Sequence, residues 1–207
     1  MIVYDYEQRS DEWFTGRLGI PTASAADKIL TPGKLQPSTQ RGKYLNTLLA
    51  EWATGESVDG FEGTKWTDRG TELEPEARAY FEYTTGMETR QAGFVFRDES
   101  RLSGCSPDGL IGDDSGLEMK CPMPATHVSY LLAGKVPTGY LAQIQFSIWV
   151  CGARSWWFQS YCPGLPAVLY ECQRDPKWMV ALDEHIPTFI ADLLAGRERL
   201  RELGVVK

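Results

Sequence analysis

The stretch CSPDGLIGDDSGLEMKCP, residues 105–122, places the acidic turn GDDSG between two short apolar segments. The turn, residues 112–116, has the composition of a hairpin connection. It predicts that residues 108–111 and 116–121 form short strands that pair side by side. The rest of the fold can be placed around this β-hairpin.

Three polar side chains of the hairpin can meet in one place. Alternate side chains of a strand lie on the same face, so Glu118 and Lys120 project together. Pro107 fixes φ before Asp108, and strand pairing brings the Asp108 carboxylate alongside the Glu118 strand, although ten positions separate the two acids. Two facing carboxylates repel each other unless a cation joins them, and their hard oxygen atoms select Mg²⁺ or Mn²⁺. The implied chemistry is metal-assisted attack of water on a phosphodiester, with Lys120 orienting the water or taking its proton.

The same residues fit a simpler interpretation. Asp108 can make an ordinary SPDG turn, while Glu118 and Lys120 form an exposed cross-strand ion pair. Acidic turns and Glu-x-Lys triplets are common, so the spacing taken alone favours this structural interpretation. A serine-hydrolase mechanism has no support, because the chain holds only His127 and His185 and neither lies near a GxSxG-like motif.

Helical and strand patterns alternate along the chain. Helices are predicted at residues 11–18, 22–30, 38–55, 68–85, 138–150 and from 176 onward, the last bent or broken at Pro187. Strands are predicted at residues 93–96, 101–106, 108–111, 116–121, 156–158 and 168–172. The turn-rich segment 31–38 is a candidate mobile loop. This order predicts an α/β or α+β fold with a central sheet, built as one domain over residues 1–207.

Composition limits the class of protein. Of the 207 residues, 43% are hydrophobic and 24% charged, which is typical of a globular domain. The net charge of −7 argues against nonspecific adhesion to nucleic acid over the whole surface, so any DNA site must be a local basic lining. The chain lacks a long apolar run and a secretory signal pattern, so we expect a cytosolic protein. Five cysteines without a CxxC pair predict small buried thiols rather than a zinc site or a disulfide framework.

Five segments carry more information than the acid spacing alone. They are RLGIPTAS (17–24), LLAEWATG (48–55), CSPDGL (105–110), GLEMKCP (116–122) and AQIQFSIWV (142–150). In this order, between Gln8 and Phe189, they resemble the phage lambda exonuclease and its viral-recombinase relatives, which belong to the PD-(D/E)xK nuclease superfamily. The resemblance implies a restriction-endonuclease-like core with a central mixed β-sheet flanked by helices.

The resemblance also implies roles for residues of the hairpin and of the helix before it. The expected catalytic and metal-binding residues are Asp108, Glu118, Lys120 and Glu74, with Leu117 as a ligand through its backbone carbonyl. Glu74 matches an acid near a second metal, so two Mg²⁺ ions are expected, with Mn²⁺ as a substitute. Glu72 and Glu76 flank Glu74, and an exposed helical face at i, i+4 explains those two.

A pocket for the 5′-phosphate of the substrate is implied at Arg17, Ser24, Ser106 and Gln143. Arginine offers a forked, permanently charged donor set to phosphate, and a hydroxyl near a helix N-terminus adds neutral donors. Taken singly, Arg17 also fits a plain surface cation and Ser24 a plain helix cap. Contacts with DNA are expected at Trp13, Lys34, Arg41 and Trp66. Aromatic residues at helical spacing are more often core, which is the alternative for the two tryptophans.

These expectations combine into a Mg²⁺-dependent exonuclease that digests double-stranded DNA from the 5′ end, releases 5′-mononucleotides and leaves a 3′ single strand for recombination. The resemblance implies a ring-shaped homotrimer around the duplex and a phage single-strand annealing protein as partner. We expect a phage or prophage gene expressed in the cytoplasm of a bacterial host. Two alternatives stay open: an endonuclease on the same scaffold, and a noncatalytic protein that binds DNA ends.

Overall fold

The computed structural model describes residues 1–58 and 65–205, with side chains described from residue 69 onward in the second range. Its central feature is a four-stranded sheet in the order β4-β5-β6-β7. These strands are Gly109–Ile111, Ser115–Lys120, Ser155–Ser160 and Val168–Gln173. Strands β4 and β5 pair antiparallel with Gly109 opposite Leu117, which confirms the predicted hairpin. Because β5 and β6 run parallel while β6 and β7 run antiparallel, the sheet is mixed.

A smaller antiparallel sheet lies beside it, in the order β1-β2-β3. Its strands are Ile2–Tyr4, Phe94–Phe96 and Gly104–Cys105. Strand β1 was not predicted, since three residues are too few for an alternating pattern to be recognised. Only Gly104–Cys105 of the segment predicted as a strand at residues 101–106 pairs with β2.

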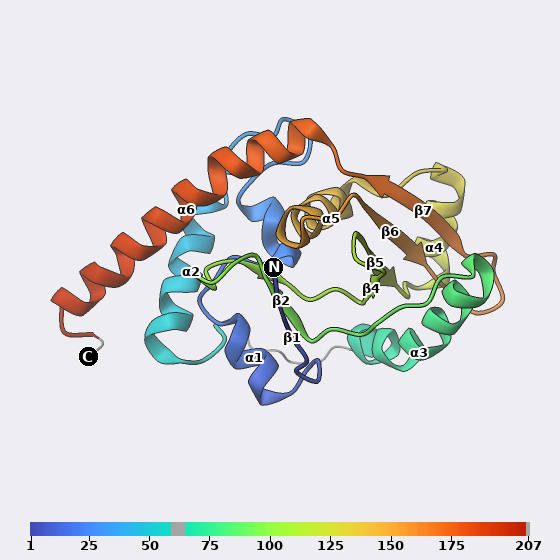
Figure 1. Ribbon diagram of the computed structural model, residues 1–207, viewed down its shortest axis with the longest axis horizontal. Coiled ribbons are helices and arrows are strands. Elements are labelled where there is room, and N and C mark those ends of the chain that lie inside the picture. The colour runs from blue at the N-terminus through green and yellow to red at the C-terminus, as the bar shows by residue number, and fades with distance from the viewer. Residues whose placement is uncertain (59–64, 206–207) are drawn as a thin grey trace.

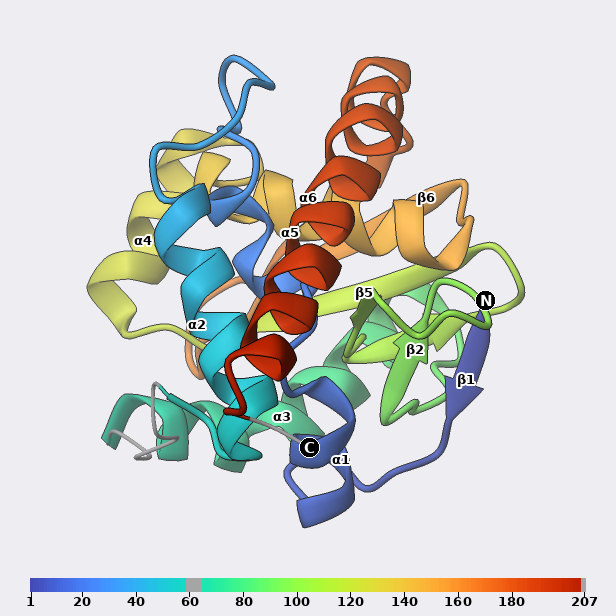
Figure 2. The same cartoon turned by 90° about the vertical axis from the view of Figure 1, so that its left-hand side faces the viewer.

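Helices surround the sheets in the order α1, η1, α2, α3, α4, α5 and α6. They span Asp11–Arg17, Ala23–Lys28, Arg41–Thr54, Lys65–Thr85, Pro124–Ala133, Thr138–Cys151 and Pro176–Glu202, and η1 is a 3-10 helix. Figure 1 shows α5 between the four-stranded sheet and α6, and both views place α2 along α6 (Figures 1 and 2). Residues 144–150 of α5 are all buried, so α5 forms the centre of the main core.

The two faces of β5 meet different partners. Leu117 and Met119 pack with Ala77 and Phe81 of α3 in a separate apolar cluster. The alternation along the strand therefore turns Glu118 towards the opposite face, where α5 lies. The Glu118 carboxylate on this face of the hairpin is therefore buried, while Asp108 and Lys120 stay partly exposed and line cavities.

The predicted helices differ from the structure in three places. The segment predicted as a helix at residues 22–30 is the 3-10 helix Ala23–Lys28. Helix α6 runs through Pro187 without a break, with Ile186 and Phe189 buried on either side of it. Tertiary packing of these side chains offsets the backbone hydrogen bond that proline removes. Helix α4 was not predicted at all.

Two further features concern the helices and the cysteines. None of the described helices is both long and apolar enough to cross a lipid bilayer. The five cysteines are free thiols, and those of Cys105, Cys162 and Cys172 are buried.

Candidate active site

Asp108, Glu118 and Lys120 converge where β4 begins and β5 ends. The Asp108 backbone N–H donates to the Leu117 carbonyl at 3.1 Å, and its carboxylate Oδ2 accepts from the Met119 N–H at 2.5 Å. Glu118 Oε1 forms an ion pair with the Lys120 ammonium. The hairpin thus brings the three side chains together as its register predicted.

Burial distinguishes this cluster from an ordinary surface ion pair. The Glu118 side chain is 3% exposed and that of Lys120 29% exposed. The interpretation as an exposed cross-strand pair is therefore wrong for this chain. A buried carboxylate needs compensating partners, and Glu118 also accepts a hydrogen bond from Gln143 Nε2 of α5 at 2.7 Å.

Burial and neighbouring charges shift the pKa values of the cluster. Burial, followed by the charge of Glu118, raises the pKa of Asp108 to about 7 from 3.8. Burial acts to lower the pKa of Lys120, but the nearby Glu118 and Asp108 carboxylates outweigh it and the net shift is upward. The site favours any additional positive charge placed near its two carboxylates.

The donor set at this site fits a hard divalent cation. Among the described residues, Asp108 Oδ1 and Glu118 Oε2 take part in no hydrogen bond, and the Leu117 carbonyl uses one lone pair on the Asp108 N–H. In that same part of the chain no three His, Cys, Asp or Glu side chains form a ready-made metal cage. Mg²⁺ commonly binds through one or two carboxylates and takes its other ligands from water and substrate phosphate.

Glu74 is the acid of α3 that borders this site. It lines one cavity with Asp108 and another with Lys120. Its Oε1 accepts a hydrogen bond from the Arg9 guanidinium at 2.8 Å. Of its neighbours, Glu72 is exposed, and Glu76 is exposed with its carboxylate bonded to the Tyr161 hydroxyl at 2.6 Å.

Arg78 was missed by sequence reasoning. It lies one helical turn after Glu74, and its Nη2 donates to the Asp108 carbonyl at 2.5 Å while Nη1 donates to Thr89 Oγ1 at 3.0 Å. These bonds tie α3 to the backbone of the Asp108 turn. The spacing of four residues from Glu74 on the same helix was the only signal in the sequence.

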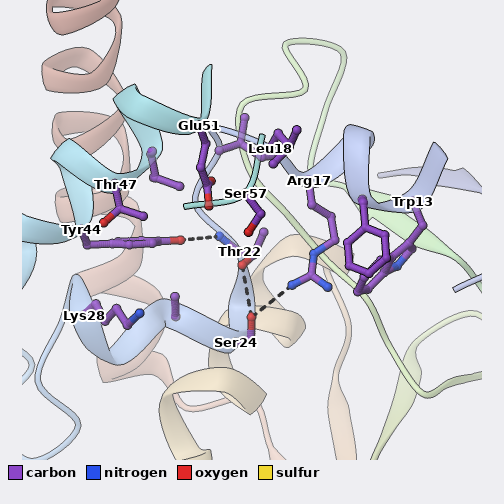
Figure 3. Close-up of a pocket in the computed structure, with 14 residues that line it drawn as sticks. Trp13, Arg17, Leu18, Thr22, Ser24, Lys28, Tyr44, Thr47, Glu51 and Ser57 are labelled. Carbon is purple, nitrogen blue, oxygen red and sulfur yellow. Dashed lines mark hydrogen bonds between the residues drawn. The ribbon is translucent and has the colours of Figure 1, made fainter. Parts of the chain in front are cut away.

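A second pocket, of about 260 Å³, lies beside α1 and η1 and contains Arg17 and Ser24 (Figure 3). Arg17 Nη2 donates to Ser24 Oγ at 3.4 Å, and Ser24 is also within 3.2 Å of Thr22 Oγ1. The guanidinium lies 4.0 Å from the centroid of the Trp13 ring, which holds it across the pocket. Burial lowers the pKa of Arg17, yet the side chain stays cationic at any ordinary pH. Thr22 and Lys28 line the same pocket and were not singled out from the sequence.

Ser106 and Gln143 lie outside the lining of this pocket. Ser106 Oγ accepts from Trp13 Nε1 at 3.0 Å, so it lies behind the ring that supports Arg17. Gln143 contacts the carboxylate site instead, through Glu118. Trp13 links the two sites, because its ring contacts the Arg17 guanidinium and its Nε1 donates to Ser106, two residues before Asp108.

The four expected DNA contacts have different surroundings. Trp13 is 6% exposed and its Nε1 also donates to the Gly93 carbonyl, so its ring belongs to the core and is closed to stacking bases. Arg41 forms an ion pair with Asp192 of α6 at 3.0 Å. Lys34 is exposed in the 31–38 segment. The side chain of Trp66 lies outside the described residues.

Solved structures of known proteins share this architecture. An alkaline exonuclease from Laribacter hongkongensis is 32% identical, with a TM-score of 0.83 over 94% of this chain and 98% of that one. A structure of the same exonuclease in complex with dAMP matches equally well, at 31% identity. A phage-related exonuclease from Haemophilus somnus 129PT, at 16% identity and a TM-score of 0.66 over 85% of this chain and 95% of that one, shares the fold. These matches confirm the PD-(D/E)xK-type fold.

Sequence comparisons agree with the structural ones. ExoD of Escherichia coli K12 is 37% identical over 76 residues, which are 34% of this chain and 82% of ExoD. The model of the YqaJ-like viral recombinase domain matches residues 12–154, more than two thirds of the chain and a range that contains the carboxylate cluster and the Arg17 pocket. By this match, the chain belongs to the YqaJ-like viral recombinase family.

Proposed function

We propose that this chain is a Mg²⁺-dependent exonuclease that digests double-stranded DNA from its 5′ ends and releases 5′-mononucleotides. The observation that carries the proposal is the buried cluster of Asp108, Glu118 and Lys120 beside a separate pocket that contains Arg17. The names of its structural relatives support an exonuclease, and the structure with dAMP supports a nucleotide as ligand of that relative.

Asp108, Glu118 and the Leu117 carbonyl would hold the metal, because they offer oxygen atoms in one buried place. A bound Mg²⁺ would activate water and offset charge on the phosphate, and Mn²⁺ has the same preference for oxygen ligands. Glu74 lies at the border of the site and is the candidate ligand for a second ion. Gln143 and Lys120 fix the orientation of Glu118.

In this proposal Lys120 acts on the water that attacks the phosphodiester. Its ammonium is held by Glu118, on the face of β5 where the carboxylates meet. From there the Lys120 ammonium would orient the water and offer positive charge to the phosphate, and because its pKa is raised it would stay protonated and take the water's proton only after losing its own. Arg78 keeps the Asp108 turn in place from the side of α3.

The Arg17 pocket gives a physical reason for a preference for strand ends. A terminal phosphate carries more negative charge than a phosphodiester and can enter a pocket, whereas an internal one remains within the strand. Arg17 and Ser24 offer a charged fork and a hydroxyl to such a group. A 5′-phosphate bound there would place the first phosphodiester towards the neighbouring carboxylates.

We further propose that the 3′ strand left by digestion serves recombination with a phage-type single-strand annealing protein, and that the chain works as a ring-shaped homotrimer. Membership of a viral recombinase family supports the first point. The second point would reconcile the net charge of −7 with DNA binding, because a closed ring retains duplex DNA without a basic surface over the whole chain.

The proposal is tested by incubating the protein with Mg²⁺ and two substrates, blunt linear duplex and covalently closed circular duplex. We expect mononucleotide release from the linear duplex alone, loss of that release with EDTA, and at least a roughly 100-fold loss in Lys120→Ala. Cleavage of the circle would identify an endonuclease instead. Binding of linear ends with no Mg²⁺-dependent digestion would identify a noncatalytic end-binding protein.

A further inference from the structure

Arg9 is a cation of the carboxylate site to which the hairpin motif assigns no role. It lies in the turn before α1 with φ of 74°, in the left-handed region that disfavours residues with a Cβ atom. Its Nη2 is 2.8 Å from Glu74 Oε1. The Arg9 side chain lines both the cavity that contains Asp108 and the cavity that contains Lys120. It therefore borders the carboxylate site on both of these sides.

The turn that carries Arg9 is fixed to the site by its neighbours. Gln8 Nε2 donates to the carbonyls of Ala92 and Pro107, each at 2.9 Å, and Pro107 directly precedes Asp108. The Ser10 N–H closes the turn on the Glu7 carbonyl at 3.0 Å. Arg9 is therefore held at a set position relative to the metal-binding carboxylates, in a strained conformation that the surrounding bonds maintain.

The Arg9 guanidinium has N–H donors that form no hydrogen bond among the described residues. Arginine carries five N–H donors, and only Nη2 of Arg9 takes part in a hydrogen bond among the described residues. The side chains of Arg9 and Glu74 are each 35% exposed, so the pair is open to the cavities on both sides. A pair this open contributes little to stability, which makes a purely structural role a poor explanation for a strained backbone.

We propose that Arg9 binds a phosphate of the DNA strand that is being cut, next to the carboxylates of Asp108 and Glu118. The inference rests on the proposed function, since it adds a substrate-binding residue to that site. Glu74 holds the guanidinium in place before DNA arrives, and the Arg9 side chain lines the cavities in which a backbone phosphate would lie. Lys120 and Arg78 also line these cavities, but Lys120 is paired with Glu118 and Arg78 is bonded to the Asp108 carbonyl and Thr89, so Arg9 adds a positive charge with unused donors.

The experiment compares Arg9→Gly, Arg9→Lys and the control Arg101→Gly. Glycine adopts positive φ freely, so the variant at Arg9 folds without new strain, which thermal unfolding checks. Arg101 also has positive φ, of 55°, and is exposed, so its change to glycine removes the same charge and the same strain elsewhere. Two quantities are measured: binding of linear duplex in EDTA over a range of salt concentrations, and kcat and KM for digestion with Mg²⁺.

We expect Arg9→Gly to bind duplex about 10-fold more weakly, with the slope of log affinity against log salt reduced by about 1, and to raise KM. Arg9→Lys should restore the slope but only part of the affinity, and Arg101→Gly should match the wild type. An unchanged slope and KM with a lower kcat would overturn the inference, because Arg9 would then act only through Glu74. If the wild-type protein digests no DNA, the proposed function fails, while the binding slopes alone still decide the role of Arg9.

Discussion

The Asp108 carboxylate occupies a position where its own charge is unfavourable. Burial and the neighbouring Glu118 raise its pKa to about 7, although a backbone N–H and Lys120 partly stabilise its charge. Functional sites commonly keep such groups at the expense of stability. A cation bound between the two carboxylates stabilises the Asp108 charge, and without a cation this charge destabilises the fold.

The metal-free protein should therefore gain stability from Asp108→Asn. The pKa of Asp108 is about 7 in the folded protein and 3.8 in the unfolded chain. Its contribution to the free energy of unfolding is therefore fully present below pH 3.8 and is lost as the pH rises through 7. We expect Asp108→Asn to raise Tm by about 2–4 °C at pH 8 in EDTA, with the gain vanishing towards pH 4. Thermal unfolding across this pH range measures it.

Asp98 gives the matched control, since hydrogen bonds from Ser100 lower its pKa rather than raise it. Asp98→Asn should bring no gain in Tm at pH 8. A Tm of Asp108→Asn equal to or below that of the wild type at pH 8 would show that the Asp108 charge is already compensated in the metal-free fold.

Arg17 should matter most for substrates that carry a terminal phosphate. We expect Arg17→Ala to slow digestion of 5′-phosphorylated duplex by roughly 10-fold or more, and to slow 5′-hydroxyl duplex much less, because the lost bonds are charge-assisted bonds to that phosphate. Single-turnover digestion of the two substrates gives the comparison. Arg90→Ala, which removes a side chain that is 57% exposed, should leave both rates unchanged. Equal slowing of the digestion of both substrates by Arg17→Ala would contradict the proposal that Arg17 binds the 5′-phosphate.

At the scale of elements, the close contact of β5 with β6 fixes the hairpin. A Cβ at Gly116 would overlap the ring of Trp156, which is fully buried in the main core. We expect Gly116→Ala to destabilise the protein by about 1–3 kcal/mol, as measured by urea unfolding, because neither the strand nor the ring can move freely. In Gly139→Ala the added methyl meets no atom within 4 Å in α5, so stability should stay equal or rise. Equal stability of the two variants would mean that β5 and β6 separate more easily than their packing indicates.

The elements that sequence could predict are those whose signals are local. The acidic turn of residues 112–116 and the alternation in β5 predicted the hairpin, and helical spacing predicted α2 and α5. Strand β1 depends on pairing with β2, about ninety residues away, and its own three residues carry no pattern. The position of Pro187 within α6 depends on packing around Ile186 and Phe189, which a rule for isolated helices cannot include.

In the candidate site, too, the residues that lie close together in the sequence were predictable and those joined by tertiary contacts were not. Asp108, Glu118 and Lys120 share one hairpin, so the register alone brings them together. Arg9 reaches the site from the turn before α1 and Arg78 from α3, and both do so through tertiary contacts with residues far away in the sequence. Gln143 contacts Glu118, because α5 crosses the polar face of β5, and its expected contact with a phosphate stays a prediction.

At the scale of the whole molecule, the acidic chain needs a way to stay on DNA. A homotrimer predicts a particle mass of about three times the 23.2 kDa chain. Light scattering over a range of protein concentrations measures it, with the mass staying constant on dilution if the ring is closed. A mass of one chain at all concentrations would contradict the homotrimer, but it would not affect the proposed chemistry of the carboxylate site.

The central claim is that Asp108 and Glu118 jointly bind a divalent cation. Titration with Mn²⁺, followed by the electron paramagnetic resonance signal of free Mn²⁺, tests it most directly in the wild type, in Asp108→Asn and in Glu118→Gln. We predict saturable binding by the wild type and at least a roughly 10-fold loss of affinity in each variant, with both variants still folded. Wild-type protein that leaves the free Mn²⁺ signal unchanged, or variants that bind as tightly as the wild type, would contradict the account.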